Sequence, residues 1–380
     1  MAKHALLSAS SSHRWLHCTP SARLEETFES TTSVFAEEGT AAHALSEHKL
    51  QLFLGKQSER PVSDYDGEDL DYYTDAYVDF AIEIIAESKK RCNDSIILLE
   101  QRLDYSKYVA EGFGTGDLVI IADGELDVCD LKYGKGVPVL AEDNPQMKLY
   151  ALGALALYDC LYDIQTVRMS ICQPRLDSIS TYEISVDELI QWAENELRPK
   201  AELAFNGEGE YVAGEHCRFC RAKHTCRARA ESNLELARLD FKQSALLTDE
   251  EISEVLSKAE VIAAWVEDIK HYALTEAVKN SRQWPGFKIV EGRSNRKYSD
   301  ESKVAEALLV NGSYTENEIY TKDLLSITAM EKLLGKKQFN NLLGSLVMKP
   351  QGKPVLAPIS DKRHEFTAAN TAIADFKEEI

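Results

Sequence analysis

The sequence contains no apolar run of about 20 residues, the length that a membrane-spanning helix requires. Its first ten residues, MAKHALLSAS, also lack the apolar core of a secretory signal. These absences lead us to expect a cytoplasmic protein with no membrane partner. The eight cysteines are then not expected to form disulfides, because disulfide frameworks belong to oxidising compartments. Metal ligation is the better expectation for those that cluster.

Positive charge is also scarce, since 43 Lys and Arg residues face 63 Asp and Glu residues and the formal net charge is −20 at pH 7. This balance argues against broad binding to a polyanion. The net charge does not exclude a local basic groove, because the charges are unevenly placed. Carboxylates gather between Glu25 and Asp79, whereas Lys and Arg gather between Arg218 and Arg229. The sequence lacks a G-x-G-x-x-G signature, which disfavours a redox enzyme with a nicotinamide or flavin. The 380 residues, 44% of them hydrophobic, fit one large or two modest globular domains.

The most informative segment that is present spans residues 112–132, GFGTGDLVIIADGELDVCDLK. Two apolar runs flank an Asp-Gly dipeptide, which favours a tight hairpin turn. We expect Asp117 to open the first strand, and Asp130 and Lys132 to share one face of the second, because strand side chains alternate. Hairpin pairing would then bring the two carboxylates together. Buried like charges repel unless a cation joins them, so the segment predicts a hard divalent metal with oxygen ligands.

Hydrophobic periodicity predicts a mixed α/β fold around this hairpin. The expected order of helix, three strands, helix and strand gives a mixed sheet with helices on its faces. His43 lies in the first long helix. Glu100 lies in the strand before the hairpin and either faces the site or is a solvated strand carboxylate. The expected helices are 37–54, 70–90, 143–158 and 185–204, and the expected strands are 95–103, 118–122, 126–131, 167–172 and 180–184.

A second cluster of chemistry-bearing residues lies in EHCRFCRAKHTCRA and holds Cys217, Cys220 and Cys226. Three thiols so close together rarely serve as core filler, because buried free cysteines are usually scattered. We expect the neighbouring Arg and Lys residues to lower the thiol pKa values and so to favour thiolate ligation. A four-ligand site needs one more ligand, either Cys18 or, for zinc, His216 or His224. The other cysteines are expected in the core: Cys92, Cys129, Cys160 and Cys172.

Taken together, these features resemble the PD-(D/E)XK nuclease superfamily, in the branch shared by RecB-type nuclease domains and CRISPR-associated iron–sulfur exonucleases. The resemblance covers about residues 8–230 and implies a restriction-endonuclease-like αβββαβ core. The matching residues, in the family's order, are His43 in GTAAH, Asp117 in GTGD, Asp130-Leu131-Lys132 as the (D/E)-x-K element, and Gln146 and Tyr150 in QMKLY.

The resemblance also implies roles for these residues. Mg²⁺ or Mn²⁺ would be held by His43, Asp117, Asp130 and the backbone carbonyl of Leu131. Catalytic roles fall to the two carboxylates with Lys132, and to Gln146 and Tyr150, which would bond the phosphate backbone. A [4Fe–4S] cluster would be held by Cys18, Cys217, Cys220 and Cys226; the alternative is Zn²⁺.

The predicted function is a metal-dependent deoxyribonuclease, an exonuclease acting on DNA ends or single strands. The exonuclease mode rests on the resemblance alone, which places the protein in phage DNA recombination or replication, with a protein of that process as a partner. The alternative is a catalytically silent DNA-binding accessory protein of recombination.

Beyond residue 230 the character of the sequence changes, and we expect a separate, mostly helical extension over residues 231–380. This arrangement resembles an uncharacterised phage and prophage family in which such a nuclease domain carries a C-terminal extension. We predict a long helix from Thr248 to Lys279, and then a basic segment. Arg293, Arg296 and Lys297 in that segment would contact phosphates, so the extension is a candidate nucleic-acid or partner-binding module; the alternative is a solvated basic face.

Overall fold

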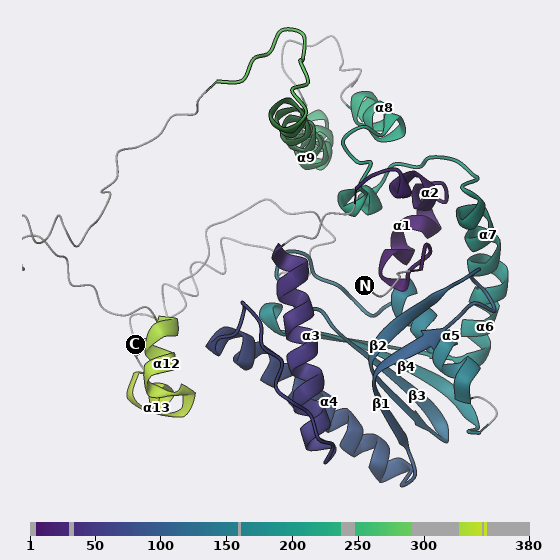
Figure 1. Cartoon of the computed structure of the whole chain (residues 1–380), viewed down its shortest axis with the longest axis vertical. Helices are drawn as coiled ribbons and strands as arrows, with labels where there is room; N and C mark the ends of the chain where they lie inside the picture. Colours follow the sequence, from purple (N-terminus) through teal and green to yellow (C-terminus); the bar gives the residue numbers. More distant parts are fainter. Residues whose placement is uncertain are drawn as a thin grey trace, which may run out of the picture. The chain divides into compact units, whose positions relative to one another are not determined.

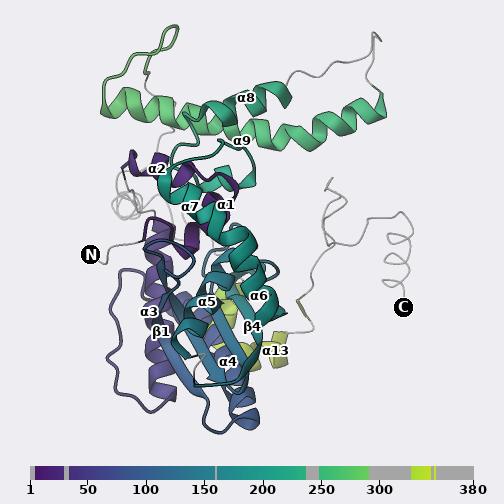
Figure 2. The same ribbon diagram turned by 90° about the vertical axis from the view of Figure 1, so that its right-hand side faces the viewer.

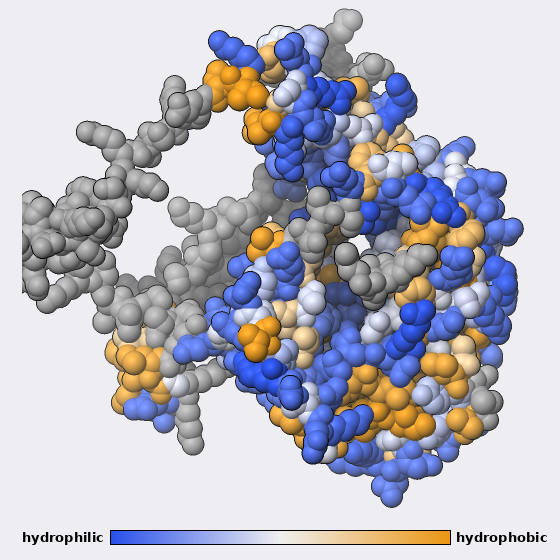
Figure 3. Space-filling view, viewed as in Figure 1, coloured by the Kyte–Doolittle hydropathy of each residue, from blue (hydrophilic) through white to orange (hydrophobic). Residues whose placement is uncertain are grey.

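The structure is a computed structural model, which describes residues 5–29, 34–158, 161–236, 248–290, 327–343 and 346–347. The chain divides into two compact units, residues 1–276 and 277–380. The predicted functional division at residue 230 stays a prediction. Hydrophilic side chains dominate the face shown in Figure 3, in keeping with the high charge content. Over the described residues, no helix combines the length and the apolar character needed to cross a membrane.

A five-stranded mixed sheet forms the centre of the first unit (Figure 1). Its strands follow the order β1-β2-β3-β4-β5, in which the β3–β4 pair is parallel and the other pairs are antiparallel. The predicted hairpin is confirmed, because Ala122 pairs with Glu125 around the Asp-Gly turn. The strands are β1 (Ile96–Asp104), β2 (Phe113–Ala122), β3 (Gly124–Leu131), β4 (Ile164–Gln173) and β5 (Ser178–Ser185).

Helices cover both faces of this sheet (Figure 1). One face packs against α3 (Val34–Phe53) and α4 (Glu68–Arg91), and the other packs mainly against α5 (Pro145–Tyr158). Leu118 of β2 belongs to the core under α3 and α4, whereas Val119 belongs to the α5 core. Burial on both sides explains why the strand interiors are continuous apolar runs. The predicted mixed α/β class is therefore confirmed.

The remaining helices of the first unit surround the α5 side or follow the sheet. The predicted capping box is present, because Ser185 and Glu188 exchange side-chain and backbone hydrogen bonds. The single helix predicted over 185–204 is instead interrupted by a π-helical turn. Figure 2 shows α9 as a long helix, as predicted. These elements are η1 (Ala9–Ser11), α1 (Ser12–His17), α2 (Ser21–Glu26), η2 (Pro174–Leu176), α6 (Val186–Trp192), η3 (Ala193–Leu197), α7 (Arg198–Asn206), η4 (Glu215–Phe219), α8 (Arg227–Leu236) and α9 (Asp249–Lys279).

In the second unit the structure describes two short helices, α12 (Ile327–Leu334) and α13 (Lys336–Leu343). Gly335 joins them with a φ of 74°, a left-handed conformation that glycine adopts readily. The predictions made for Cys160, Arg293, Arg296 and Lys297 lie outside the described residues.

Candidate metal centre

The start of β2 differs from the prediction. The strand begins at Phe113, so Asp117 lies inside it and does not open it. The reason is that β1 continues to Asp104 and supplies ladder partners to the glycine-rich segment, with Arg102 opposite Thr115 and Asp104 opposite Phe113. Pairing with β1 therefore outweighs the low strand preference of the glycines.

Gly114 and Gly116 of GFGTGD share the face of β2 that packs toward the α5 core. A Cβ atom on Gly114 would lie 2.7 Å from Tyr150 Cε1, and one on Gly116 would lie 2.9 Å from Leu103 Cδ1. This face must therefore be free of side chains for the core to approach. Thr115, between the two glycines, projects toward the opposite face, because successive strand side chains alternate. Asp117 also faces that side, where its Oδ1 lies 3.1 Å from His43 Nδ1. Leu118 of the α3 and α4 core and Val119 of the α5 core show that the alternation shifts by one position after Asp117.

Glu100 of β1 lies where the β1–β2 ladder is interrupted, between the pairs Leu99–Leu118 and Gln101–Gly116. Its φ is 45°, in the left-handed region that strains a glutamate. Before this residue, Ile96 and Leu98 pack toward the α5 core, whereas after it Leu103 does so. The alternation of faces therefore slips by one position at Glu100. The slip directs Glu100, together with Asp117, toward the side of the sheet where α3 lies.

His43 of α3 meets these two carboxylates. Its Nδ1 lies 3.1 Å from Asp117 Oδ1 and 4.0 Å from Glu100 Oε1. One candidate ligand atom from each of the three residues lies within 4.8 Å of the others, and among the described residues no other trio of His, Cys, Asp or Glu meets this condition. An octahedral ion with ligands at about 2.1 Å separates adjacent ligand atoms by about 3.0 Å and opposite ones by about 4.2 Å. The donor set and its spacing therefore fit a hard divalent ion.

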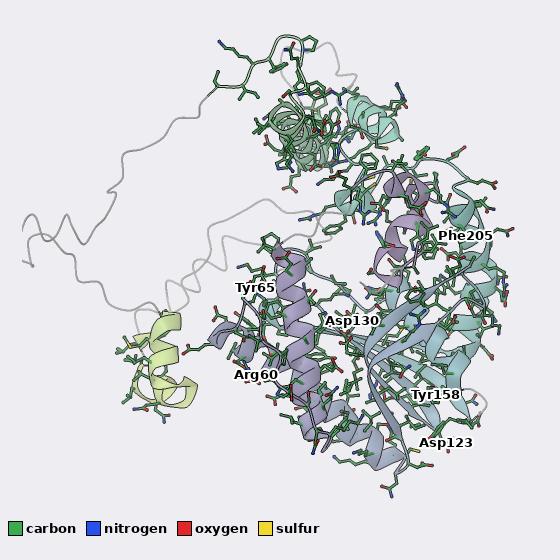
Figure 4. All side chains as sticks on the ribbon, in the orientation of Figure 1. Arg60, Tyr65, Asp123, Asp130, Tyr158 and Phe205 are labelled. Carbon is green, nitrogen blue, oxygen red and sulfur yellow. The ribbon has the colours of Figure 1, made fainter. Side chains whose placement is uncertain are left out.

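Asp130, labelled in Figure 4, lies beside this trio on the α5 side of the sheet, where its Oδ1 accepts a hydrogen bond from Gln146 of α5. Lys132 Nζ lies 2.7 Å from Asp130 Oδ2 and donates a hydrogen bond to Gln146 Oε1 at 3.0 Å. Gln146 Nε2 contacts both Asp130 Oδ1, at 3.1 Å, and the Tyr150 hydroxyl, at 3.0 Å. The buried Asp130 Oδ2 accepts no well-aligned hydrogen bond. The predicted catalytic residues on this face thus form one connected network, in which Lys132 is the ion-pair partner of Asp130 Oδ2.

The backbone at Leu131 links the two groups. The β2–β3 ladder ends at the pair of Leu118 and Cys129. Beyond this pair, Asp117 Oδ2 accepts a hydrogen bond from the Leu131 N–H at 2.6 Å. In an extended strand the N–H and C=O of one residue face the same neighbour. The Leu131 carbonyl therefore faces the β2 side, as its predicted role as a ligand requires.

The pKa values at the site reflect an excess of negative charge. Burial by itself lowers the pKa of His43. The negative charge of Asp117 and the hydrogen bond to it outweigh this effect and raise the pKa to about 9. Burial and the neighbouring Asp117 raise the pKa of Glu100 to about 7. Burial also raises the pKa of Asp130, and the attraction of Lys132 offsets this only in part. A divalent cation between the carboxylates would relieve this repulsion.

The loop that follows Lys132 is held by one buried side chain. Gln173, at the end of β4, is 2% exposed. Its amide nitrogen donates to the carbonyl oxygens of Gly134, at 2.7 Å, and Val137, at 2.9 Å, and its oxygen accepts from the Val139 N–H at 3.1 Å. Three hydrogen bonds from this one side chain therefore hold the loop in place.

The structure also brings together the two segments that carry the clustered cysteines. Glu25 of α2 bonds Arg14 Nε at 2.7 Å and accepts from the Arg221 N–H at 2.7 Å. His216 forms a hydrogen bond with Cys18, which raises the pKa of the histidine. Chain regions about 200 residues apart in sequence are thus docked at Cys18, which places this residue next to the Cys217 motif.

The thiols themselves are not gathered around one point. Among the described residues no trio that includes cysteine sulfurs lies within 4.8 Å, whereas a single Zn²⁺ with Zn–S bonds of 2.3 Å would hold its sulfurs about 3.8 Å apart. Cys226 lines an apolar pocket with Leu24 and Phe28. The expectation of lowered thiol pKa values is wrong for Cys220, because burial raises its pKa to about 12 and Arg14 offsets this only slightly.

Glu100 is the site residue that sequence reasoning left undecided. Its neighbours, Ile96 to Leu99, form an apolar run, so a carboxylate at this position was the one available signal. The interruption of the β1–β2 ladder at Glu100 and its positive φ decide its orientation, and neither can be read from the residue itself.

Two comparisons with known proteins bear on the chain. A solved structure titled "Crystal structure of SSO0001" is similar over 57% of this chain and 96% of its own, with 14% sequence identity and a TM-score of 0.21. At that TM-score the similarity supports no conclusion about fold or function. A family model described as "Protein of unknown function (DUF2800)" matches residues 4–364. The chain therefore belongs to the DUF2800 family.

Proposed function

We propose that the protein is a metal-dependent nuclease of the PD-(D/E)XK type that hydrolyses phosphodiester bonds in DNA. The observation that carries the proposal is the convergence of two groups where β2 and β3 separate. His43, Glu100 and Asp117 approach from the α3 side, and Asp130 with Lys132 approaches from the α5 side. An imidazole, three carboxylates and an ammonium suit phosphoryl transfer assisted by a hard metal ion.

The first proposed role is to hold the metal ion. His43, Glu100 and Asp117, with Asp130 and the Leu131 carbonyl, would hold Mg²⁺ or Mn²⁺, the imidazole nitrogen favouring Mn²⁺ alongside Mg²⁺. When bound, such an ion polarises a phosphate and lowers the pKa of a coordinated water.

The α5 side of the site supplies positioning and charge. Lys132 lies where its ammonium can donate to charge developing on the phosphate. Gln146 fixes the separation of Lys132 and Asp130, because its amide bonds both. Tyr150 in turn holds the amide nitrogen of Gln146, so the orientation of the network depends on α5.

We also propose the [4Fe–4S] cluster on Cys18, Cys217, Cys220 and Cys226. The docking of the N-terminal segment onto the Cys217 motif supports it, and a cluster there would close a long chain loop, which restricts the unfolded state. Iron content and visible absorption after purification without oxygen test this proposal. Zinc in place of iron would support the alternative.

The nuclease test uses protein purified without oxygen and end-labelled single- and double-stranded DNA with Mg²⁺ or Mn²⁺. Asp130→Ala and Lys132→Ala should each reduce cleavage at least about a hundredfold, the scale for removing one key charge or donor. Asp79→Asn and Lys90→Ala change the same residue types at exposed positions of α4 and should cleave like the wild type. Intact DNA with every metal, together with retained DNA binding, would instead support the silent accessory protein.

A further inference from the structure

An exposed row of side chains extends from the metal centre along β1 and β2. Arg102 lies opposite Thr115 in the ladder, and Phe113 lies one pair further on, opposite Asp104. Phe113 and Thr115 share the face of Asp117, because the glycines between them occupy the other face. Arg102 and Thr115 are exposed, and Phe113 is half-buried.

The row has an arginine and an aromatic ring in direct contact. The guanidinium carbon of Arg102 lies 3.7 Å from the centroid of the Phe113 ring, a cation–π arrangement. The carboxylate of Asp104, the nearest acidic group of the row, accepts a hydrogen bond from the Ser106 N–H at 2.8 Å. This bond turns the carboxylate toward its own turn, so Arg102 is the charged group that faces solvent between Phe113 and the metal centre.

The spacing of the row suits an extended polymer. Side chains two residues apart on one strand face are separated by about 6.8 Å, which is on the scale of the distance between neighbouring phosphates of an extended single strand. Arg102 therefore lies one such step from Glu100 along β1, and Phe113 lies two such steps from Asp117 along β2.

We propose that this row binds a single strand of nucleic acid and leads it to the metal centre. Arg102 contacts a phosphate, and Phe113 stacks on a base near the scissile bond. The strand is single because an aromatic face takes a base that is not stacked within a duplex. The inference rests on the proposed nuclease function for its direction toward the site, and it narrows the substrate class of that site.

The test measures binding without cleavage, in EDTA, by fluorescence anisotropy of labelled dT20, rU20 and a blunt DNA duplex over a salt series. Phe113→Ala should weaken binding of the single strands about 5- to 150-fold, the range for loss of one stacked base. Phe113→Leu retains packing but not stacking and should show most of this loss. Arg102→Ala should reduce the slope of log K against log salt by about 0.7, as loss of one phosphate contact predicts.

Two matched controls lie away from the row. Arg60→Ala removes an arginine paired with Asp71, and Phe53→Ala removes a phenylalanine that is 48% exposed at the end of α3; neither should change binding. If the variants lose equal affinity for dT20 and rU20, the row binds single strands of either sugar type. If they lose affinity for dT20 alone, the row binds DNA.

Three results overturn the proposal: wild-type protein that does not bind single strands, unchanged binding by the Phe113 and Arg102 variants, or equal weakening for the duplex. The binding test requires no hydrolysis. If the protein cleaves no DNA but binds single strands in a way that depends on Phe113, the proposed nuclease function is refuted and the proposed binding role of the row is not.

Discussion

Metal binding at the proposed centre should depend steeply on pH, because two of its ligands hold protons at neutral pH. The pKa of His43 is about 9 and that of Glu100 about 7. A metal ligand must be deprotonated, so binding has to displace these protons. Affinity should therefore rise with pH and level off only above the pKa of His43.

The size of the effect follows from the two pKa values. At pH 7 His43 is almost fully protonated and Glu100 about half protonated, so about 1.5 protons should leave for each ion bound. Between pH 6 and pH 8 the same values give an increase in affinity of about a thousandfold, or about 4 kcal/mol. A surface carboxylate site with ordinary pKa values would change little over this range.

Isothermal titration with Mn²⁺ at pH 6, 7 and 8 measures the affinity, and repeating the pH 7 titration in buffers of different ionisation enthalpy counts the released protons. His43→Ala should lower proton release by about one and flatten the pH dependence above pH 7. Asp79→Asn on the exposed face of α4 serves as the control. Release of less than half a proton by the wild type, or no Mn²⁺ binding at any of these pH values, would refute the assignment of ligands.

Two further predictions concern the packing that positions the site. Gly114→Ala should lower the free energy of unfolding by about 1–3 kcal/mol, because its Cβ would lie 2.7 Å from Tyr150 Cε1; Gly136→Ala, where a Cβ meets nothing within 4 Å, should stay near wild type in urea denaturation. Gln173→Leu removes three hydrogen bonds from the loop after Lys132 and should speed tryptic cleavage after Lys135 several-fold with little change in circular dichroism. An unchanged cleavage rate would show that the loop is held by other contacts.

Local sequence chemistry was sufficient for several parts of the fold. The Asp-Gly turn set the β2–β3 hairpin, because glycine adopts the positive φ of 86° that Gly124 has. Period-two alternation placed Asp130 and Lys132 on one face, where both contact Gln146. Ser185 and Glu188 predicted the start of a helix, and they form its capping box. Each of these features depends on residues a few positions apart.

The composition of the site depended on contacts that no local pattern encodes. Glu100 faces His43 because the alternation slips at a strained residue, and pairing of β1 with the glycine-rich start of β2 sets that position. The sequence motif alone predicts that β2 begins at Asp117, because glycine is unfavourable in strands. Glycine is found in a strand where a neighbouring ladder and a close-packed helix require it.

The sequence by itself determined the hairpin, the class of the fold and which residue types carry chemistry, because turn geometry and side-chain alternation are local properties. The tertiary structure alone decided that His43, Glu100 and Asp117 form one trio, and that Gln146 of α5 holds Asp130 beside it. It also decided that Cys18 docks against His216. The physical reason is that these arrangements depend on which strands neighbour each other and how helices pack across them, over separations in sequence of tens to hundreds of residues.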